Sequence, residues 1–333
     1  MTAITAKRHS SLRRSVAGVI KSGLAAPWIW RYLIREWSIH DILVLTYHRI
    51  GAADTGAPIT SEQFVSQMDW LAERCNIIAP DVLPDFFAGR MKPRRPSVCL
   101  TFDDGHRCLH DVVYPVLRQR NLRAIAFLAT GPITNHAYVW PDDIRQRLLA
   151  ADRESLTLPF FGEQRLLDKH QRMFVAGQII SELKRRPDEE RQVVIDVMRQ
   201  SITLPRERSP MVSWVEAANM GDVFHWGAHT HTHPVLSRVS ADIARDEIRK
   251  SRQTIVENTG QAVDLFAYPN GSRDDYTDEV KAVLRNEGFM AAFTTNTGFV
   301  SRSDDLFALN RCATTAPQLS DFAWMTARPS WAA

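Results

Sequence analysis

Short apolar segments of strand length recur along the second half of this sequence, and helical patterns separate them. A strand is predicted at 222–230, a helix at 240–260, a strand at 262–268, a helix at 275–288 and a strand at 289–295. The apolar runs are almost uninterrupted, which is typical of strands buried on both faces of a sheet. Their alternation with helices predicts an α/β fold built on a parallel sheet or barrel.

The first half of the chain and its end follow the same pattern. Strands are predicted at 41–47, 97–102 and 122–130, and a final strand at 307–315. A helix is expected to begin in the cap region at Thr60 and Ser61, with Phe64, Met68 and Leu71 on one face. Phe64 stands where a Glu would complete a capping box with Ser61, so the predicted cap is incomplete.

The helix at 240–260 has clear start and stop signals. Ser240 is its predicted N-cap, and Gly260 stands just past its end. Ile243, Ile248 and Ile255 are predicted to form its apolar face.

The segment at about 132–212 interrupts the alternation. It is rich in charge and helical in pattern, so we interpret it as a helical insertion within one domain spanning 39–333. A lid, a wall of a cleft and a segment without a role in the site all fit this pattern.

Composition excludes several classes of protein. The chain is 44% hydrophobic, which fits a globular domain, and its net charge of +3 is too small to indicate a nucleic-acid partner. The cysteines, none in a CxxC pair, do not resemble a disulfide framework, and Cys99 is predicted to be a small core residue.

The basic segment at 1–38 has two interpretations. Lys21 interrupts the apolar stretch that a secretory signal would need, and no segment is long enough for a transmembrane helix. A solvated helix capping the domain is favoured over an amphipathic helix that lies on a membrane with Trp28 and Trp30. The expected location is therefore cytoplasmic, with peripheral contact at the inner membrane as the second interpretation. The sequence does not indicate an oligomeric state.

Two acidic residues close the predicted strand at 97–102. Asp103 and Asp104 in "LTFDDG" precede a glycine that permits a sharp turn. Parallel α/β folds build their sites at this edge of the sheet. A turn that uses Asp for local reasons explains "DDG" equally well when it is taken alone.

Alternating histidines follow the strand at 222–230. His229 and His233 are four residues apart, so a helical turn there would place both rings on one face. Two imidazoles and a carboxylate form a facial metal site with open positions. We therefore expect Asp104, His229 and His233 to bind a metal, with His231 pointing elsewhere.

These motifs resemble those of a known family. "TFDDG" followed by "HTHTHPVLS" is similar to the polysaccharide deacetylases with a NodB homology domain, carbohydrate esterase family 4. "FAYPNG" at 266–271 resembles the third family motif in its FAYPYG form, and "LTYHRI" resembles the start of branches that act on extracellular polysaccharides.

The resemblance implies a distorted (β/α) barrel and a set of catalytic roles. It implies a divalent metal, commonly zinc, on Asp104, His229 and His233. It also implies that Asp103 is the general base and that the backbone N–H of Asn270 stabilises the oxyanion.

The sequence departs from the family pattern at three places. Ala267 stands where many members have an Arg, and His106 replaces a usual Tyr; we expect His106 to be solvated. No histidine follows His233, so the usual late acid is missing. His48, after the first strand, is a candidate acid or a structural histidine, and Arg311 is assigned no role.

The expected function is metal-dependent removal of N-acetyl groups from a glycan of N-acetylglucosamine-like units, releasing acetate. Exopolysaccharide biosynthesis or modification is favoured over degradation. Two alternatives remain: a catalytically impaired glycan-binding member of the same fold, and an amidohydrolase acting on a non-sugar amide.

Overall fold

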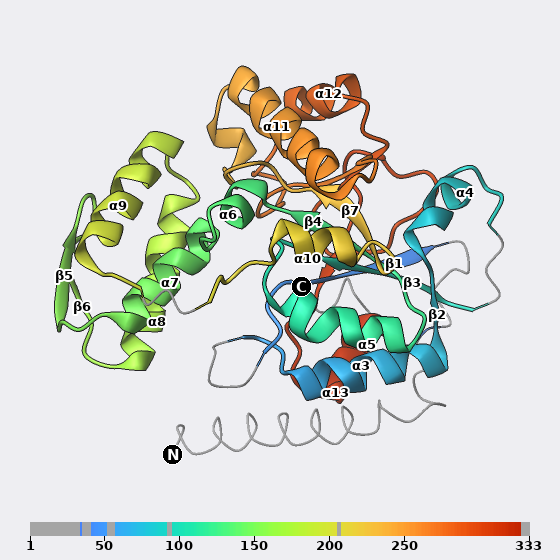
Figure 1. Cartoon of the computed structure of the whole chain (residues 1–333), viewed down its shortest axis with the longest axis horizontal. Helices are drawn as coiled ribbons and strands as arrows, with labels where there is room; N and C mark the ends of the chain where they lie inside the picture. The colour runs from blue at the N-terminus through green and yellow to red at the C-terminus, as the bar shows by residue number, and fades with distance from the viewer. Residues whose placement is uncertain (1–33, 35–40, 52–56, 92–94, 205–207, 328–333) are drawn as a thin grey trace, which may run out of the picture.

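A single parallel sheet forms the framework of the molecule (Figure 1). The computed structural model describes residues 34, 41–51, 57–91, 95–204 and 208–327, so the basic segment at 1–38 lies almost entirely outside the described residues. The strands of the sheet are β1 (Ile42–Tyr47), β2 (Asn76–Ile77), β3 (Ser97–Phe102), β4 (Ala124–Leu128), β7 (Phe224–Ala228), β8 (Leu265–Ala267), β9 (Ala291–Phe293) and β10 (Cys312–Ala313).

The strand order is β10-β1-β3-β4-β7-β8-β9, with β2 added beside β3. All these pairings are parallel, from Leu45 opposite Cys312 at one end to Ala267 opposite Phe293 at the other. The carboxyl ends of the strands therefore meet at one edge of the sheet, as the sequence pattern predicts.

The two faces of the sheet bury different side chains. On β1, Leu43 and Leu45 belong to the core between the sheet and its helices, whereas Ile42 and Val44 belong to a second core with Cys99. Successive side chains of a strand point to opposite faces, so an unbroken apolar run is needed to fill both cores. This arrangement is the curled, distorted (β/α) barrel that the family resemblance implies.

Helices cover the outside of the sheet. In Figure 1, α3 and α13 lie together on one side, and α11 and α12 lie together on the opposite side. The helices of the barrel are α3 (Ser61–Arg74), α4 (Leu83–Phe87), α5 (Tyr114–Gln119), α6 (Thr130–Thr134), α10 (Trp214–Asn219), α11 (Ala241–Thr259), α12 (Asp278–Asn286) and α13 (Leu319–Ala327). Short 3-10 turns lie at Pro80–Val82 and Leu236–Arg238, and a π-helical turn lies at Leu109–Val113.

Two details of the helices differ from the sequence prediction. Thr60 is the N-cap of α3 and forms a full capping box with Gln63, so the box begins one residue earlier than the predicted one at Ser61. On α11, Ile248 and Ile255 are buried, but Ile243 in the first turn is 46% exposed. Ser240 and the left-handed Gly260 cap α11 as predicted.

The insertion is a separate layer beside the barrel (Figure 1). It contains α7 (Trp140–Ala150), α8 (Lys169–Leu183) and α9 (Asp188–Ser201), together with an antiparallel hairpin of β5 (Ser155–Leu158) and β6 (Gly162–Arg165). Its apolar side chains form a core of their own. The hairpin adds a strand element to a segment whose pattern predicted helices alone.

Candidate metal centre and cleft

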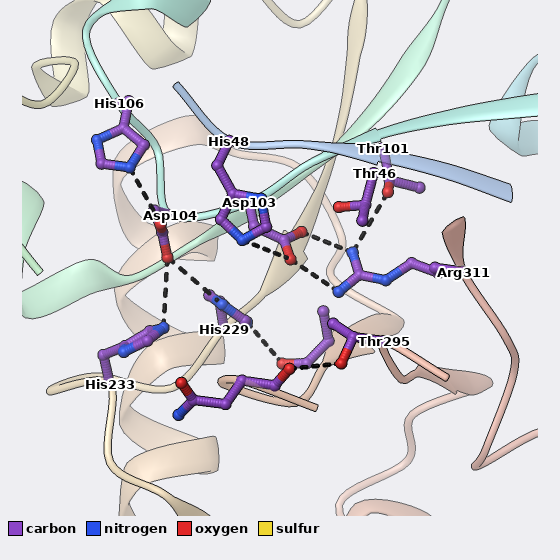
Figure 2. Close-up of polar contacts among 12 residues, drawn as sticks. Thr46, His48, Thr101, Asp103, Asp104, His106, His229, His233, Thr295 and Arg311 are labelled. Atoms are coloured by element: carbon purple, nitrogen blue, oxygen red, sulfur yellow. Dashed lines mark hydrogen bonds and ion pairs between the residues drawn. The ribbon is translucent and has the colours of Figure 1, made fainter. Parts of the chain in front are cut away.

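The motif residues gather at the carboxyl edge of the sheet. Asp103 and Asp104 follow β3, His229 follows β7, and Asn270 follows β8 by three residues. They line one cleft of about 420 Å³, together with His233. Three loops that are distant in the sequence therefore contribute to a single site (Figure 2).

The loops of the site adopt left-handed backbone conformations. Asp104 has φ 74°, Thr230 has φ 63°, His233 has φ 64° and Asn270 has φ 60°. Residues other than glycine adopt this left-handed backbone region at a cost in conformational free energy, and such residues cluster at functional sites.

The two histidines meet through this loop geometry and not through a helical turn, which corrects the sequence prediction. The stretch from His229 to His233 is not helical. The hydroxyl of Thr230 accepts a hydrogen bond from the backbone N–H of His233 at 3.1 Å. The ring centroids of His229 and His233 are 4.9 Å apart.

Asp104 and both histidine rings converge on one point. Asp104 Oδ1 lies 3.5 Å from His229 Nε2 and 3.3 Å from His233 Nε2. The three residues are buried, and one potential ligand atom from each lies within 4.8 Å of the others. His231 is turned away from this group, and its Nδ1 lies 2.8 Å from Thr130 Oγ1.

Hydrogen bonds fix the orientation of the histidine loop. His229 Nδ1 lies 2.7 Å from the carbonyl oxygen of Ala267, so Nδ1 donates and Nε2 keeps its lone pair toward Asp104. On the outer side, the Glu247 carboxylate accepts hydrogen bonds from the backbone N–H groups of His231 and Thr232.

The electrostatics of the group suit a cation. Burial lowers the pKa of His229 to about 4, so its ring is neutral near pH 7, as a metal ligand must be. Burial opposes ionisation of Asp104, but the hydrogen bond with His106 and the nearby His233 ring hold its pKa well below its ordinary value. Among the described residues, no hydrogen-bond donor reaches the buried Asp104 Oδ1. A buried anionic oxygen beside two imidazole nitrogens fits a divalent metal.

His106 contacts this group directly, which overturns the expectation that it is solvated. It is 4% exposed, and its Nε2 lies 3.0 Å from Asp104 Oδ2. The same nitrogen lies 3.5 Å from Asp142 Oδ2, at the start of the insertion. The turn after Asp104 folds the ring back over the carboxylate, a local geometry that the residue type alone does not reveal.

Arg311 holds Asp103. The guanidinium donates to both carboxylate oxygens at 2.7 Å, and both residues are almost fully buried. Its Nε donates to the carbonyl oxygen of Thr294 at 2.8 Å. Burial of Asp103 favours its neutral form, but the Arg311 charge outweighs that effect and lowers the pKa. Arg311 thus supplies, from the end of the chain, the arginine that is missing at Ala267.

His48 and Asn270 line the same cleft as Asp103. His48 Nε2 is 3.8 Å from Asp103 Oδ2, and the His48 side chain is 44% exposed toward the cleft. The Asn270 carbonyl oxygen accepts a hydrogen bond from the Thr295 hydroxyl at 2.6 Å, which fixes the orientation of this backbone turn.

The insertion forms part of the wall of the cleft. Its contributions include Val139, Asp142 and Arg145 from the region of α7, and Met173 and Lys184 from α8 and its end. Of the three roles that the sequence leaves open, a segment without a role in the site is therefore the one that the structure does not support.

The comparisons with known proteins define the family. The polysaccharide deacetylase family model matches residues 90–157 and 166–292, more than half of the chain. The chain therefore belongs to the polysaccharide deacetylase family, and it is an enzyme of the polysaccharide deacetylase class. A search of curated proteins found no match.

Solved deacetylase structures share the fold. The deacetylase PplD of Streptococcus pyogenes, in complex with acetate, has 18% identity and a TM-score of 0.56, over 82% of this chain and 92% of that chain. IcaB of Ammonifex degensii has 21% identity and a TM-score of 0.56, over 85% of this chain and 97% of that chain. The deacetylase domain of BpsB from Bordetella bronchiseptica has 15% identity and a TM-score of 0.52, over 83% and 96%. The likeness confirms the predicted barrel.

Within the described part of the chain, no helix is both long and apolar enough to span a membrane.

Proposed function

We propose that this chain removes N-acetyl groups from an N-acetylated glycan of N-acetylglucosamine-like units and releases acetate, with zinc as its metal. The observation that carries the proposal is the pairing of two centres in one cleft. A buried carboxylate held by Arg311 lies directly beside a carboxylate that faces two histidines.

Asp104, His229 and His233 would hold the metal. Zinc favours nitrogen and carboxylate ligands, and three protein ligands leave a position open, as in catalytic zinc sites. When bound, such an ion polarises the amide carbonyl and lowers the pKa of water at the site.

Asp103 is the proposed general base. Its lowered pKa keeps it ionised, so it accepts the proton of the attacking water, and the Arg311 fork keeps its oxygens fixed. The backbone N–H of Asn270 is the proposed hydrogen-bond donor to the carbonyl oxygen as negative charge develops there.

His48 is the proposed general acid. It borders the cleft within 3.8 Å of Asp103, so it can deliver a proton to the departing sugar amine as the C–N bond breaks. The products are then acetate and a free amine. The alternative of a catalytically impaired member rested on the missing motif arginine and late histidine. The contacts of Arg311 and His48 with Asp103 support an active enzyme instead.

The test is release of acetate from N-acetylglucosamine oligomers by the purified protein. Release that is abolished by a chelator and restored by zinc supports the proposal. If acetate is released from a small aliphatic acetamide and not from the oligomers, the substrate is a non-sugar amide. A protein that binds zinc but releases no acetate from either substrate contradicts the assignment.

A role in exopolysaccharide biosynthesis and a cytoplasmic location are further parts of this proposal, with peripheral contact of the segment at 1–38 at the inner membrane as the second interpretation. A fusion that reports on which side of the inner membrane the chain lies tests the location. Recovery in a periplasmic or secreted fraction would contradict it.

A further inference from the structure

The insertion carries positive charge into the catalytic cleft. Arg145 on α7 and Lys184 at the end of α8 line the same cleft as the metal ligands. Arg49, two residues after β1, lines it as well. We refer to Arg49, Arg145 and Lys184 as the cationic wall.

One carboxylate, that of Asp142, contacts two members of this wall. Asp142 is its nearest carboxylate, with Oδ1 at 2.8 Å from Arg145 Nη1 and Oδ2 at 3.9 Å from Arg49 Nε. The other acids of the cleft are already committed, because Asp103 pairs with Arg311 and Asp104 faces the histidines. Within the described part of the chain, the Asp142 carboxylate thus lies beside Arg145 and Arg49 and forms no ion pair with Lys184.

Lys184 is the residue of the wall that most needs a partner. Within the described ranges of the chain, no carboxylate forms an ion pair with it. It is partly buried, and burial and the nearby Arg145 charge lower its pKa, against the effect of Asp275. Asp275 Oδ2 accepts hydrogen bonds from the backbone N–H and the hydroxyl of Ser272, and the carboxylate keeps its negative charge.

A lysine in this position gains from an incoming anion. A cation that has lost part of its hydration shell is unfavourable until a negative group approaches it. Glycan chains carry such groups as uronate carboxylates and as phosphate esters. Both present oxygens that accept charge-assisted hydrogen bonds from lysine and arginine.

We propose that the cationic wall binds a negatively charged group, a carboxylate or a phosphate, on the glycan next to the N-acetylated sugar. The preferred substrate is then an anionic acetylated glycan, and Lys184 is a determinant of that preference. This inference rests on the proposed deacetylase function.

The experiment compares three probes on the zinc-loaded protein. They are a neutral N-acetylglucosamine oligomer, an oligosaccharide that alternates glucuronate with N-acetylglucosamine, and N-acetylglucosamine 1-phosphate. Acetate release gives kcat/KM, and calorimetry on the same protein gives the Kd without requiring turnover. The two anionic probes distinguish a carboxylate from a phosphate as the recognised group.

Lys184→Gln is the test variant, and Arg185→Gln is its matched control. Arg185 is the next residue in the chain, but its side chain is 70% exposed and lines the outer side of α8 with Phe174 and Gly177. Both changes remove one positive charge, so a general effect of net charge alters both proteins equally. Lys184→Arg keeps the charge and is expected to keep the preference.

We expect Lys184→Gln to weaken binding of an anionic probe and to lower its kcat/KM by about tenfold, the usual effect of losing a charge-assisted hydrogen bond. The kcat/KM for the neutral oligomer should change less than about twofold, because this probe carries no anionic group for Lys184 to bind. Added salt should weaken the binding of the anionic probe more than the binding of the neutral probe.

Two outcomes overturn the inference while leaving the proposed function intact. One is turnover of the neutral oligomer with no preference for either anionic probe. The other is an equal loss on all probes in Lys184→Gln. Failure of the proposed function looks different: no probe releases acetate, and calorimetry alone then decides whether the wall binds the anionic probes.

Discussion

The guanidinium of Arg311 donates hydrogen bonds to both carboxylate oxygens of Asp103 at 2.7 Å, although the two residues are 208 positions apart in the sequence. This buried pair connects the residue that precedes β10 to the loop after β3, at the centre of the site. A bidentate arginine both orients a carboxylate and keeps it ionised. The geometry of the proposed base thus depends on a residue outside the recognisable motifs.

We expect Arg311→Met to destabilise the protein. Removing one partner of a buried ion pair leaves a charge without compensation, which costs about 3–5 kcal/mol of unfolding free energy. The double variant Asp103→Asn with Arg311→Met should lose less than the sum of the two single variants. Urea denaturation measures all three. Simple additivity would mean that the pair contributes no coupling.

The pH dependence of activity should also change in an Arg311 variant. In the wild type, the pKa of Asp103 is lowered, so Asp103 stays ionised at every pH above the ordinary carboxyl range. Protonation of Asp103 should therefore cause no fall in kcat/KM between about pH 5 and pH 8. In Arg311→Gln, burial acts without the guanidinium and raises the pKa, so an acid limb should enter this range. Identical profiles would argue against Asp103 as the base.

The same lowered pKa links Asp103 to acid stability. Ionised Asp103 is favoured in the folded state, so its contribution to stability is present above the unfolded pKa of about 3.9 and is lost as the pH falls through the folded value.

His106 should affect metal binding without being a ligand. Its Nε2 contacts Asp104 Oδ2, and loss of such a supporting contact typically costs about 10–100-fold in metal affinity. His106→Phe is the test, with zinc affinity measured by competition with a chelating dye. His110→Gln is the control, because His110 lies in the same segment but pairs with Asp111 at 40% exposure. Equal affinity in the two variants would contradict the role of His106.

His48 should matter most when the leaving group needs a proton. We expect His48→Gln to lower hydrolysis of the sugar acetamide by about 10²–10⁴-fold. Hydrolysis of an activated aryl acetate should fall far less, because its leaving group departs as a stable anion. Parallel assays on both substrates measure the difference. An equal loss on both would point to a role for His48 in binding or in positioning Asp103.

Much of the site could be predicted from short motifs. Asp104, His229 and His233 each follow a buried strand of a parallel sheet. The carboxyl ends of such strands lie at one edge of the sheet, and this does not depend on the conformation of the loops. The helical turn on which the histidine spacing depended does not form between His229 and His233. Two histidines four residues apart look the same in a sequence whether the chain between them forms a helix or a loop. Here it forms a loop in which Thr230 and His233 have left-handed backbone conformations.

Arg311 and His106 show why the rest could not be predicted. Arg311 borders a strand of two residues, so no local periodicity indicates which way its side chain points. The position of His106 is set by the turn after Asp104 and by Asp142 from the insertion. The contacts of Arg311 with Asp103 and of His106 with Asp142 are tertiary, and neither spacing nor residue type encodes them.

The most direct test of the central claim is a joint measurement of zinc content and acetate release in Asp103→Asn and His229→Ala. The asparagine keeps the size of the side chain but cannot accept the proton, and His229 faces Asp104 with its free Nε2. We predict that Asp103→Asn binds about one zinc per chain and releases no acetate, whereas His229→Ala loses both. Circular dichroism confirms that each variant is folded. Full acetate release by Asp103→Asn, or zinc retained at wild-type affinity by His229→Ala, would contradict the account.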